Sequence, residues 1–172
     1  MLIMLSFAAY GTYVLALAAA GMSDLVRYEI PNGLSVALVA AFALLASTLP
    51  VPVTINHVLA GTAVFGLTSL LFAAGICGGG DVKLIGATAL WMGWSNLPGF
   101  LLSMTLIGAV LALCLMVARR LASSDVVVVT GVRPRRLFMK DNRVPYGVAI
   151  AIAGFLMLPR LGAVALVAAS LN

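Results

Sequence analysis

Long apolar stretches, separated by a few polar residues each, are the feature that most restricts how this chain folds. Hydrophobic residues make up 63% of the 172 residues and charged residues only 9%. Soluble domains average about 45–50% apolar and about 25% charged residues, so this chain has more apolar surface than one core can bury. The sequence therefore predicts a protein whose main solvent is lipid.

The apolar stretches are continuous rather than alternating, which favours helices over the strands of a membrane barrel. A helix needs about 20 apolar residues to cross a bilayer. We predict an all-α polytopic membrane helix bundle, with about six transmembrane helices in a single membrane-embedded domain and no separate soluble domain. The predicted spans are residues 2–22, 34–49, 57–76, 84–94, 99–118 and 144–158.

The connections between these spans are of two kinds. Uncharged turns are expected at 51–56 and 95–98, and polar loops at about 23–33, 77–83 and 119–143. Beyond the last span, residues 161–171 either continue a kinked helix or lie along the membrane interface. The first span has small residues like those of a signal-peptide cleavage site, but no Lys or Arg precedes it, which favours a retained helix.

Basic residues are concentrated on one side of the predicted bundle. Nine of the ten lie in the three polar loops, and only Arg160 lies on the opposite side. The positive-inside rule therefore places these loops in the cytoplasm and both termini outside. The 119–143 loop is expected to contact anionic lipid rather than nucleic acid, since no polar domain accompanies it. The nine residues are Arg27, Lys83, Arg119, Arg120, Arg133, Arg135, Arg136, Lys140 and Arg143.

Two carboxylates lie at span ends on this predicted cytoplasmic side. Asp24 follows the first span, and Asp81 follows three glycines after the third span. Because one helical hairpin separates them, both return to the same membrane face and are possible neighbours. Two carboxyl groups in a medium of low dielectric do not both ionise easily, so one keeps a proton. Such a pair can act as acid and base to bring water onto a peptide carbonyl, without a metal or cofactor.

The same residues also have structural interpretations, which the sequence leaves open. The three glycines either break a helix at the interface or let a peptide approach the backbone closely. Asp81 is either the N-cap of a helix over 82–94 or a reacting group. Asp24 is either an ordinary loop residue or the partner of Asp81, and Glu29 is its nearest rival.

Three motifs, in this order along the chain, resemble those of the type IV prepilin peptidase family. Gly78-Gly79-Gly80-Asp81, followed by Val82-Lys83-Leu84, is similar to the family's GxGD motif. Asp24 with Ile30-Pro31-Asn32 resembles its first aspartate motif, and Pro145-Tyr146-Gly147 resembles the opening of a late helix. A GxGD match alone is weak, but the combination is strong and covers nearly the whole chain.

The resemblance implies a membrane aspartic endopeptidase of the bacterial inner membrane, with Asp24 and Asp81 as the catalytic pair and no cofactor. Its implied substrates are prepilins or pseudopilins, most like those of Flp-type pili, whose basic leader is cut at the cytoplasmic face. The implied active-site loop and substrate-binding residues are Gly78, Gly79, Gly80, Pro31, Asn32, Lys83, Pro145, Tyr146 and Gly147.

Long members of the family carry paired CxxC motifs that are linked to methylation of the new amino terminus. This chain has no CxxC, so methyltransferase activity is not expected. Cys77 and Cys114 have no Cys or His at ligand spacing, and no metal site is predicted. The alternative functions are a non-enzymatic membrane assembly factor and a small proton-coupled transporter with the two aspartates as relay groups.

Several other residues are expected to have structural roles. Lys83 is either a snorkelling anchor or a group that interacts with a carboxylate or a lipid phosphate. Tyr146 and Gly147 are expected mainly to pack. The remaining expectations are an interfacial helix end at His57, an interfacial aromatic belt of Trp91 and Trp94, and close helix approach at Gly61, Gly66 and Gly108.

Overall fold

The structure, a computed structural model, describes residues 2–122 and 144–170. Its helices are α1 (Leu2–Arg27), α2 (Asn32–Ala46), α3 (Val51–Ala73), α4 (Gly79–Ala122) and α6 (Tyr146–Ser170). These described residues form helices and no strand, so the predicted all-α membrane bundle is confirmed. Among them, three helices are long and apolar enough to cross a membrane, namely Met4–Arg27, Val51–Ala73 and Gly79–Arg120. The count of six spans stays a prediction.

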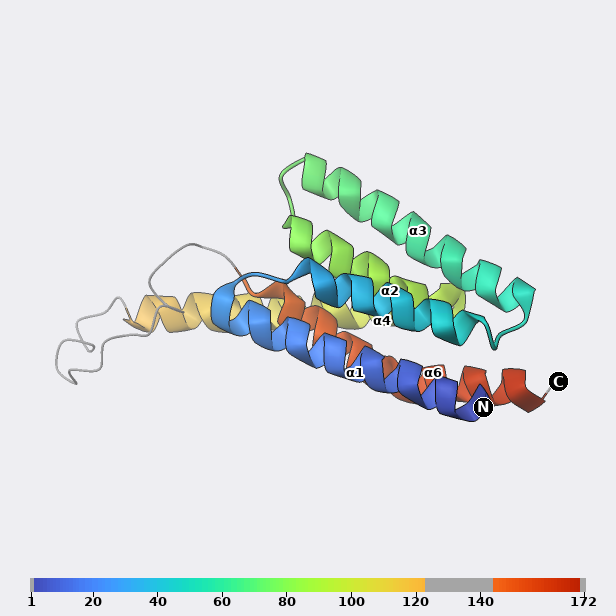
Figure 1. Cartoon of the computed structure of the whole chain (residues 1–172). Coiled ribbons are helices and arrows are strands. Elements are labelled where there is room, and N and C mark those ends of the chain that lie inside the picture. The colour runs from blue at the N-terminus through green and yellow to red at the C-terminus, as the bar shows by residue number, and fades with distance from the viewer. Residues whose placement is uncertain (1, 123–143, 171–172) are drawn as a thin grey trace.

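Successive helical segments run in alternating directions along the bundle (Figure 1). Helices α1 and α6 lie side by side, α2 contacts α1 and α4, and α3 packs on α4. Both termini therefore lie at one end of the bundle, and the starts of α2, α4 and α6 lie at the other end, near the end of α1. Segments far apart in the sequence meet at that second end.

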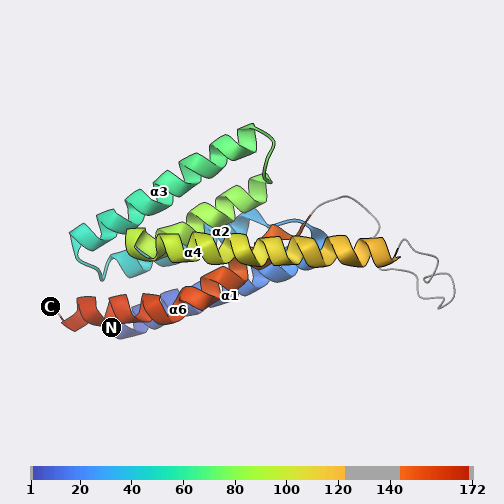
Figure 2. The ribbon, with the colours of Figure 1, turned by 180° about the vertical axis from the view of Figure 1, so that it is seen from behind.

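Helix α4 reverses direction at Gly93, where the backbone has φ 58° and ψ 176° (Figure 2). The expected turn at 95–98 is therefore wrong, because these residues are helical and Pro98 lies inside the second half of α4. Only glycine adopts this backbone conformation readily, so the reversal occurs there rather than at the proline.

Two side chains from α3 satisfy the backbone groups that the reversal leaves without helical partners. The Asn56 Oδ1 accepts a hydrogen bond from the Trp94 N–H at 3.1 Å. The Nδ1 of His57 lies 2.9 Å from the Leu90 carbonyl oxygen, as in a donated hydrogen bond. His57 is thus buried in the second turn of α3, and its expected place at a helix end in the interface is wrong.

The boundaries of other elements also differ from those expected. Helix α1 continues to Arg27, so Asp24 lies in its last turns and not in a 23–33 loop. Residues 51–56 are helical, and the chain turns just before them. Helix α6 continues through Pro159 to Ser170, so residues 161–170 extend the last helix. The basic loop begins as helix up to Ala122; the rest of it, and its expected lipid contact, lies outside the described residues.

Trp91 lies at the centre of the core, so its predicted place in an interfacial belt is wrong. Only 1% of its surface is exposed, and its indole N–H donates to the Leu38 carbonyl oxygen at 3.0 Å. Its ring also packs on Tyr13, with 4.6 Å between the ring centroids. One side chain of α4 therefore contacts both α1 and α2. Trp94, in contrast, is exposed.

Glycines permit close helix approach at two of the three expected positions. A Cβ on Gly61 would lie 2.9 Å from the Leu90 Cα, and a Cβ on Gly108 would lie 2.5 Å from the Tyr146 ring. Gly66 has no such neighbour within 4 Å, so the expectation for it is wrong.

Replacing Gly93 by alanine should destabilise the bundle. The new Cβ would have to tolerate the positive φ and would lie 2.9 Å from Asn56 Oδ1 and 3.0 Å from His57 Nε2. We expect a loss of about 1–3 kcal/mol, measured by thermal unfolding in detergent. The matched control is Gly66→Ala, which should be neutral or slightly stabilising because that helical site is open. Equal stability of Gly93→Ala and the native chain would contradict this account of the reversal.

Candidate active site

Helix α1 ends in a tight turn that directs Ile30 into the bundle. Tyr28 has a positive φ of 57°, and its N–H donates to the Asp24 carbonyl oxygen at 2.9 Å. A left-handed residue at this position commonly terminates a helix. The Ser23 hydroxyl donates to the Glu29 carbonyl oxygen at 2.8 Å, which fixes the exit. Only residues 28–31 separate α1 from α2.

Ile30 packs between the starts of α4 and α6. A Cβ on Gly80 would lie 3.2 Å from the Ile30 Cβ, and a Cβ on Gly147 would lie 2.9 Å from the Ile30 Cδ1. These two glycines therefore let one side chain contact two helices. From the sequence, Ile30 belongs to the first aspartate motif, but its side chain was assigned no role; an apolar residue within a polar connection was the available signal.

Asp24 is held by the first turn of α6. Its Oδ2 accepts a hydrogen bond from the Gly147 N–H at 2.6 Å, and only 6% of the Asp24 surface is exposed. The first N–H groups of a helix have no partner within the helix, so a carboxylate is a favourable acceptor there. A Cβ on Gly147 would lie 2.9 Å from the Asp24 Oδ2. Gly147 thus contacts Asp24 directly, beyond the packing role that the sequence favoured.

Asp81 is the third residue of α4, which begins at Gly79, so the alternative of an N-cap for a helix over 82–94 is wrong. Its side chain accepts a hydrogen bond from the Gly78 backbone, as acidic residues at this position commonly do. A Cβ on Gly78 would lie 3.0 Å from the Asp81 Oδ2, and one on Gly79 would lie 3.3 Å from the Phe72 ring. Gly78 and Gly79 therefore have close neighbours, and Gly79 and Gly80 are part of the helix.

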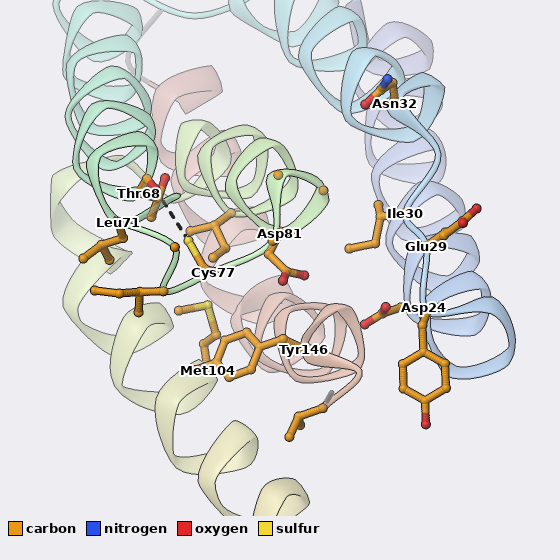
Figure 3. A pocket seen from close by; sticks show the side chains of 18 of the residues that line it. Asp24, Glu29, Ile30, Asn32, Thr68, Leu71, Cys77, Asp81, Met104 and Tyr146 are labelled. Carbon is orange, nitrogen blue, oxygen red and sulfur yellow. Dashed lines mark hydrogen bonds between the residues drawn. The ribbon is translucent and has the colours of Figure 1, made fainter. Parts of the chain in front are cut away.

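Asp24 and Asp81 face the same pocket, which has a volume of about 1090 Å³. Figure 3 shows their carboxyl groups pointing into one space from α1 and from α4. The other lining residues come from α2, α3, α4 and α6, from the connections that follow α1 and α3, and from the residue Val144 before α6. They are Tyr28, Glu29, Ile30, Asn32, Thr68, Leu71, Gly75, Ile76, Cys77, Gly78, Gly79, Gly80, Ile85, Met104, Thr105, Val144 and Tyr146.

The structure brings together some of the predicted site residues and not others. Of the predicted set, Asn32, Tyr146 and the three glycines line the pocket with the two aspartates. Pro31 is exposed and Pro145 is fully buried, and neither lines it. Gly147 does not line the pocket either; it contacts Asp24.

Lys83 has a partner that neither of its two interpretations anticipated. Its Nζ donates to the Asn32 Oδ1 at 2.9 Å, and both side chains are exposed. This hydrogen bond joins the first turn of α2 to the first turns of α4. The ammonium group is therefore held beside the pocket rather than in it.

Two carboxyl groups that face one space repel each other when both are ionised. A carboxyl pair that carries a single proton can supply an acid and a base together. Within the described residues, no group of three His, Cys, Asp or Glu side chains is placed to hold a metal ion. What the arrangement itself offers is proton transfer to and from a bound reactant.

Cys77 lies between α3 and α4, and its Sγ is 3.6 Å from the Thr68 carbonyl oxygen. Burial raises the pKa of the Cys77 thiol above its ordinary value of 9.0, and the nearby Asp81 carboxylate raises it further. The pKa of the Cys77 thiol therefore depends on the charge of Asp81.

One family model matches the chain. It is described as the type IV leader peptidase family, and the matched residues are 11–113, which include Asp24 and Asp81. No curated protein matches the chain. No solved structure matches it either.

Gly147→Ala should destabilise the chain by about 1–3 kcal/mol, since the new Cβ overlaps Asp24 and Ile30. Thermal unfolding measures the loss. Gly33→Ala, where nothing lies within 4 Å, is the matched control and should leave stability nearly unchanged. The same loss of stability in both variants would contradict the close contact of Gly147 with Asp24 and Ile30.

Alkylation of Cys77 should follow the charge of Asp81. In a Cys114→Ser chain, the rate of maleimide labelling against pH should have its midpoint above 9.0. Asp81→Asn should move the midpoint to lower pH, because loss of the negative charge favours the thiolate. Glu29→Gln removes a charge from the same pocket and is the control. A midpoint that Asp81→Asn leaves in place or raises would contradict the proximity of the two groups.

Proposed function

Because the chain belongs to the type IV leader peptidase family, we propose that it is an aspartic endopeptidase that uses Asp24 and Asp81. The observation that carries the proposal is that the two carboxyl groups, from helices far apart in sequence, face one pocket. Its proposed substrates are type IV prepilins or pseudopilins of the Flp type, cut between the basic leader and the apolar helix.

The proposed reaction uses the pair in its singly protonated state. The ionised carboxylate takes a proton from water as the water oxygen bonds to the scissile carbonyl carbon, and the protonated carboxyl donates to the carbonyl oxygen. The tetrahedral intermediate then collapses: the C–N bond breaks, the carboxyl group that took the proton from water gives it to the leaving amine, and the other carboxylate takes back a proton from a hydroxyl of the intermediate. Gly147 and Gly78 each donate a backbone hydrogen bond to one carboxyl group and so orient the pair.

The residues around the pair have proposed supporting roles. At Gly78, whose only close neighbour is Asp81, an extended peptide can approach the backbone as it enters the pocket. Asn32 and Lys83 hold the start of α2 against α4. Tyr146 covers Gly108 and forms part of the pocket wall.

The charges of the described residues support a cytoplasmic active site in the bacterial inner membrane. Arg27 and Lys83 lie at the pocket end of the bundle, and Arg119 and Arg120 end α4 at the same end. Arg160 lies beside Gly99, near the reversal of α4 at the other end. By the positive-inside rule these charges support a cytoplasmic location of the pocket end, where a prepilin leader would remain before cleavage.

Asp24→Asn and Asp81→Asn should each abolish leader removal. An amide cannot serve as acid and base, and loss of such a group typically lowers the rate by about 10²–10⁴-fold or more. The assay is co-expression with a Flp-type prepilin, followed by gel shift and amino-terminal sequencing of the product.

Asp125→Asn makes the same chemical change outside the motifs and is the control. Membrane levels of every variant are compared, so that loss of the protein is not scored as loss of activity. Cleavage that survives both single substitutions in the pair would overturn the mechanism. Unprocessed substrate with the native chain, at normal membrane levels, would count against Flp-type prepilins as substrates.

A further inference from the structure

The pocket has two chemically different ends, one on each side of Asp81. Figure 3 shows Leu71, Cys77 and Met104 on one side, and Glu29, Asn32 and Asp24 on the other. The first group comes from the end of α3, the connection after it and the second half of α4. The second group comes from the end of α1, the connection after it and the start of α2.

The α3 end of the pocket is mainly apolar, because the hydroxyls of its two threonines, Thr68 and Thr105, donate to backbone carbonyls of their own helices. Leu71 and Ile76 line the pocket and are themselves exposed, and Met104 forms the opposite wall. Large exposed apolar side chains continue from there along α3 and along the second half of α4. They are Leu67, Leu70, Phe72, Leu102 and Leu106.

The α1 end of the pocket is polar and carries an exposed carboxylate. Glu29 lies at its outer edge, beyond Asp24, and is exposed (Figure 3). Arg27 and Lys83, which lie three residues after Asp24 and two residues after Asp81, are not among the described residues that line the pocket. Lys83 is bound to Asn32. A basic peptide segment therefore meets a favourable charge at this end.

On the basis of the proposed function, we propose that this asymmetry fixes the direction in which the substrate lies. The apolar residues that follow the scissile bond occupy the α3 end, between Leu71 and Met104, and the basic leader lies past Asp24 at Glu29. In this direction the apolar helix of the substrate stays in contact with lipid-facing side chains. The reverse direction would place Lys or Arg side chains among Leu71, Ile76 and Met104, where a charge is poorly solvated.

Glu29 is then a specificity-determining residue rather than a catalytic one. Glu29→Lys should raise KM for a basic leader by about 3- to 10-fold and leave kcat nearly unchanged, as expected for an exposed charge pair. A prepilin whose leader lysines are changed to glutamate should reverse the preference, with the Glu29→Lys chain now favoured. An equal effect of Glu29→Lys on both leaders would overturn the assignment.

Native Cys77 allows the direction to be measured by disulfide cross-linking. The probe is a prepilin with one cysteine, placed in turn at positions before and after the scissile bond, with the inactive Asp24→Asn, Cys114→Ser chain. Cys77 should cross-link to the positions that follow the bond. The second chain is Glu29→Cys with Cys77→Ser and the same two substitutions, and it should cross-link to leader positions.

The opposite pattern, or the same substrate positions cross-linking to both cysteines, would overturn the proposed direction. Failure of both chains to cross-link, although the native chain cleaves the same prepilin, would also overturn it. Cleavage by the Cys114→Ser chain is measured in parallel. Failure of the direction and failure of the peptidase assignment are therefore separate results.

Discussion

Ile30 packs against Gly80 at the start of α4 and against Gly147 at the start of α6, and the geometry of the pocket depends on this contact. It brings together the starts of two helices that lie more than sixty residues apart in sequence. The same approach lets the Gly147 N–H reach the Asp24 carboxylate at 2.6 Å. A side chain at either glycine would separate these helices, and the two aspartates would no longer face a common space.

This contact also depends on how the first half of α4 packs towards the opposite end of the bundle. Asp81 stands at the start of α4, so its position follows from how the first half of that helix packs. Trp91 fixes this half against α1 and α2, and the close approach at Gly61 fixes it against α3. The reversal at Gly93 then returns the chain so that Met104 reaches the wall of the pocket.

The sequence was sufficient for features that depend on apolar length and on charge. It predicted an all-α membrane bundle, and alternating spans that return Asp24 and Asp81 to one end. It failed where a single backbone conformation or a tertiary contact decides. An uncharged turn was expected at 95–98, whereas Gly93, with support from Asn56 and His57, makes the reversal.

Other features of the site were equally hidden in the sequence. From the sequence alone Trp91 fits an interfacial position. Its hydrogen bond to the Leu38 carbonyl oxygen of α2, inside the core, could not be predicted. Asp81 looked like a possible N-cap because helix starts shift by a residue or two from sequence signals, and α4 begins earlier, at Gly79. The contact of Ile30 with two glycines joins three distant segments, and no local pattern encodes such a contact.

The central claim is that Asp24 and Asp81 face each other across one pocket in the membrane, and cysteine cross-linking tests it without a substrate. The chain carries Asp24→Cys and Asp81→Cys, with both native cysteines replaced by serine. A short thiol-specific cross-linker should join this pair in native membranes and should not join Asp24→Cys to Asn56→Cys, since Asn56 lies at the other end. Efficient labelling of each cysteine without cross-linking of the Asp24–Asp81 pair would contradict the account.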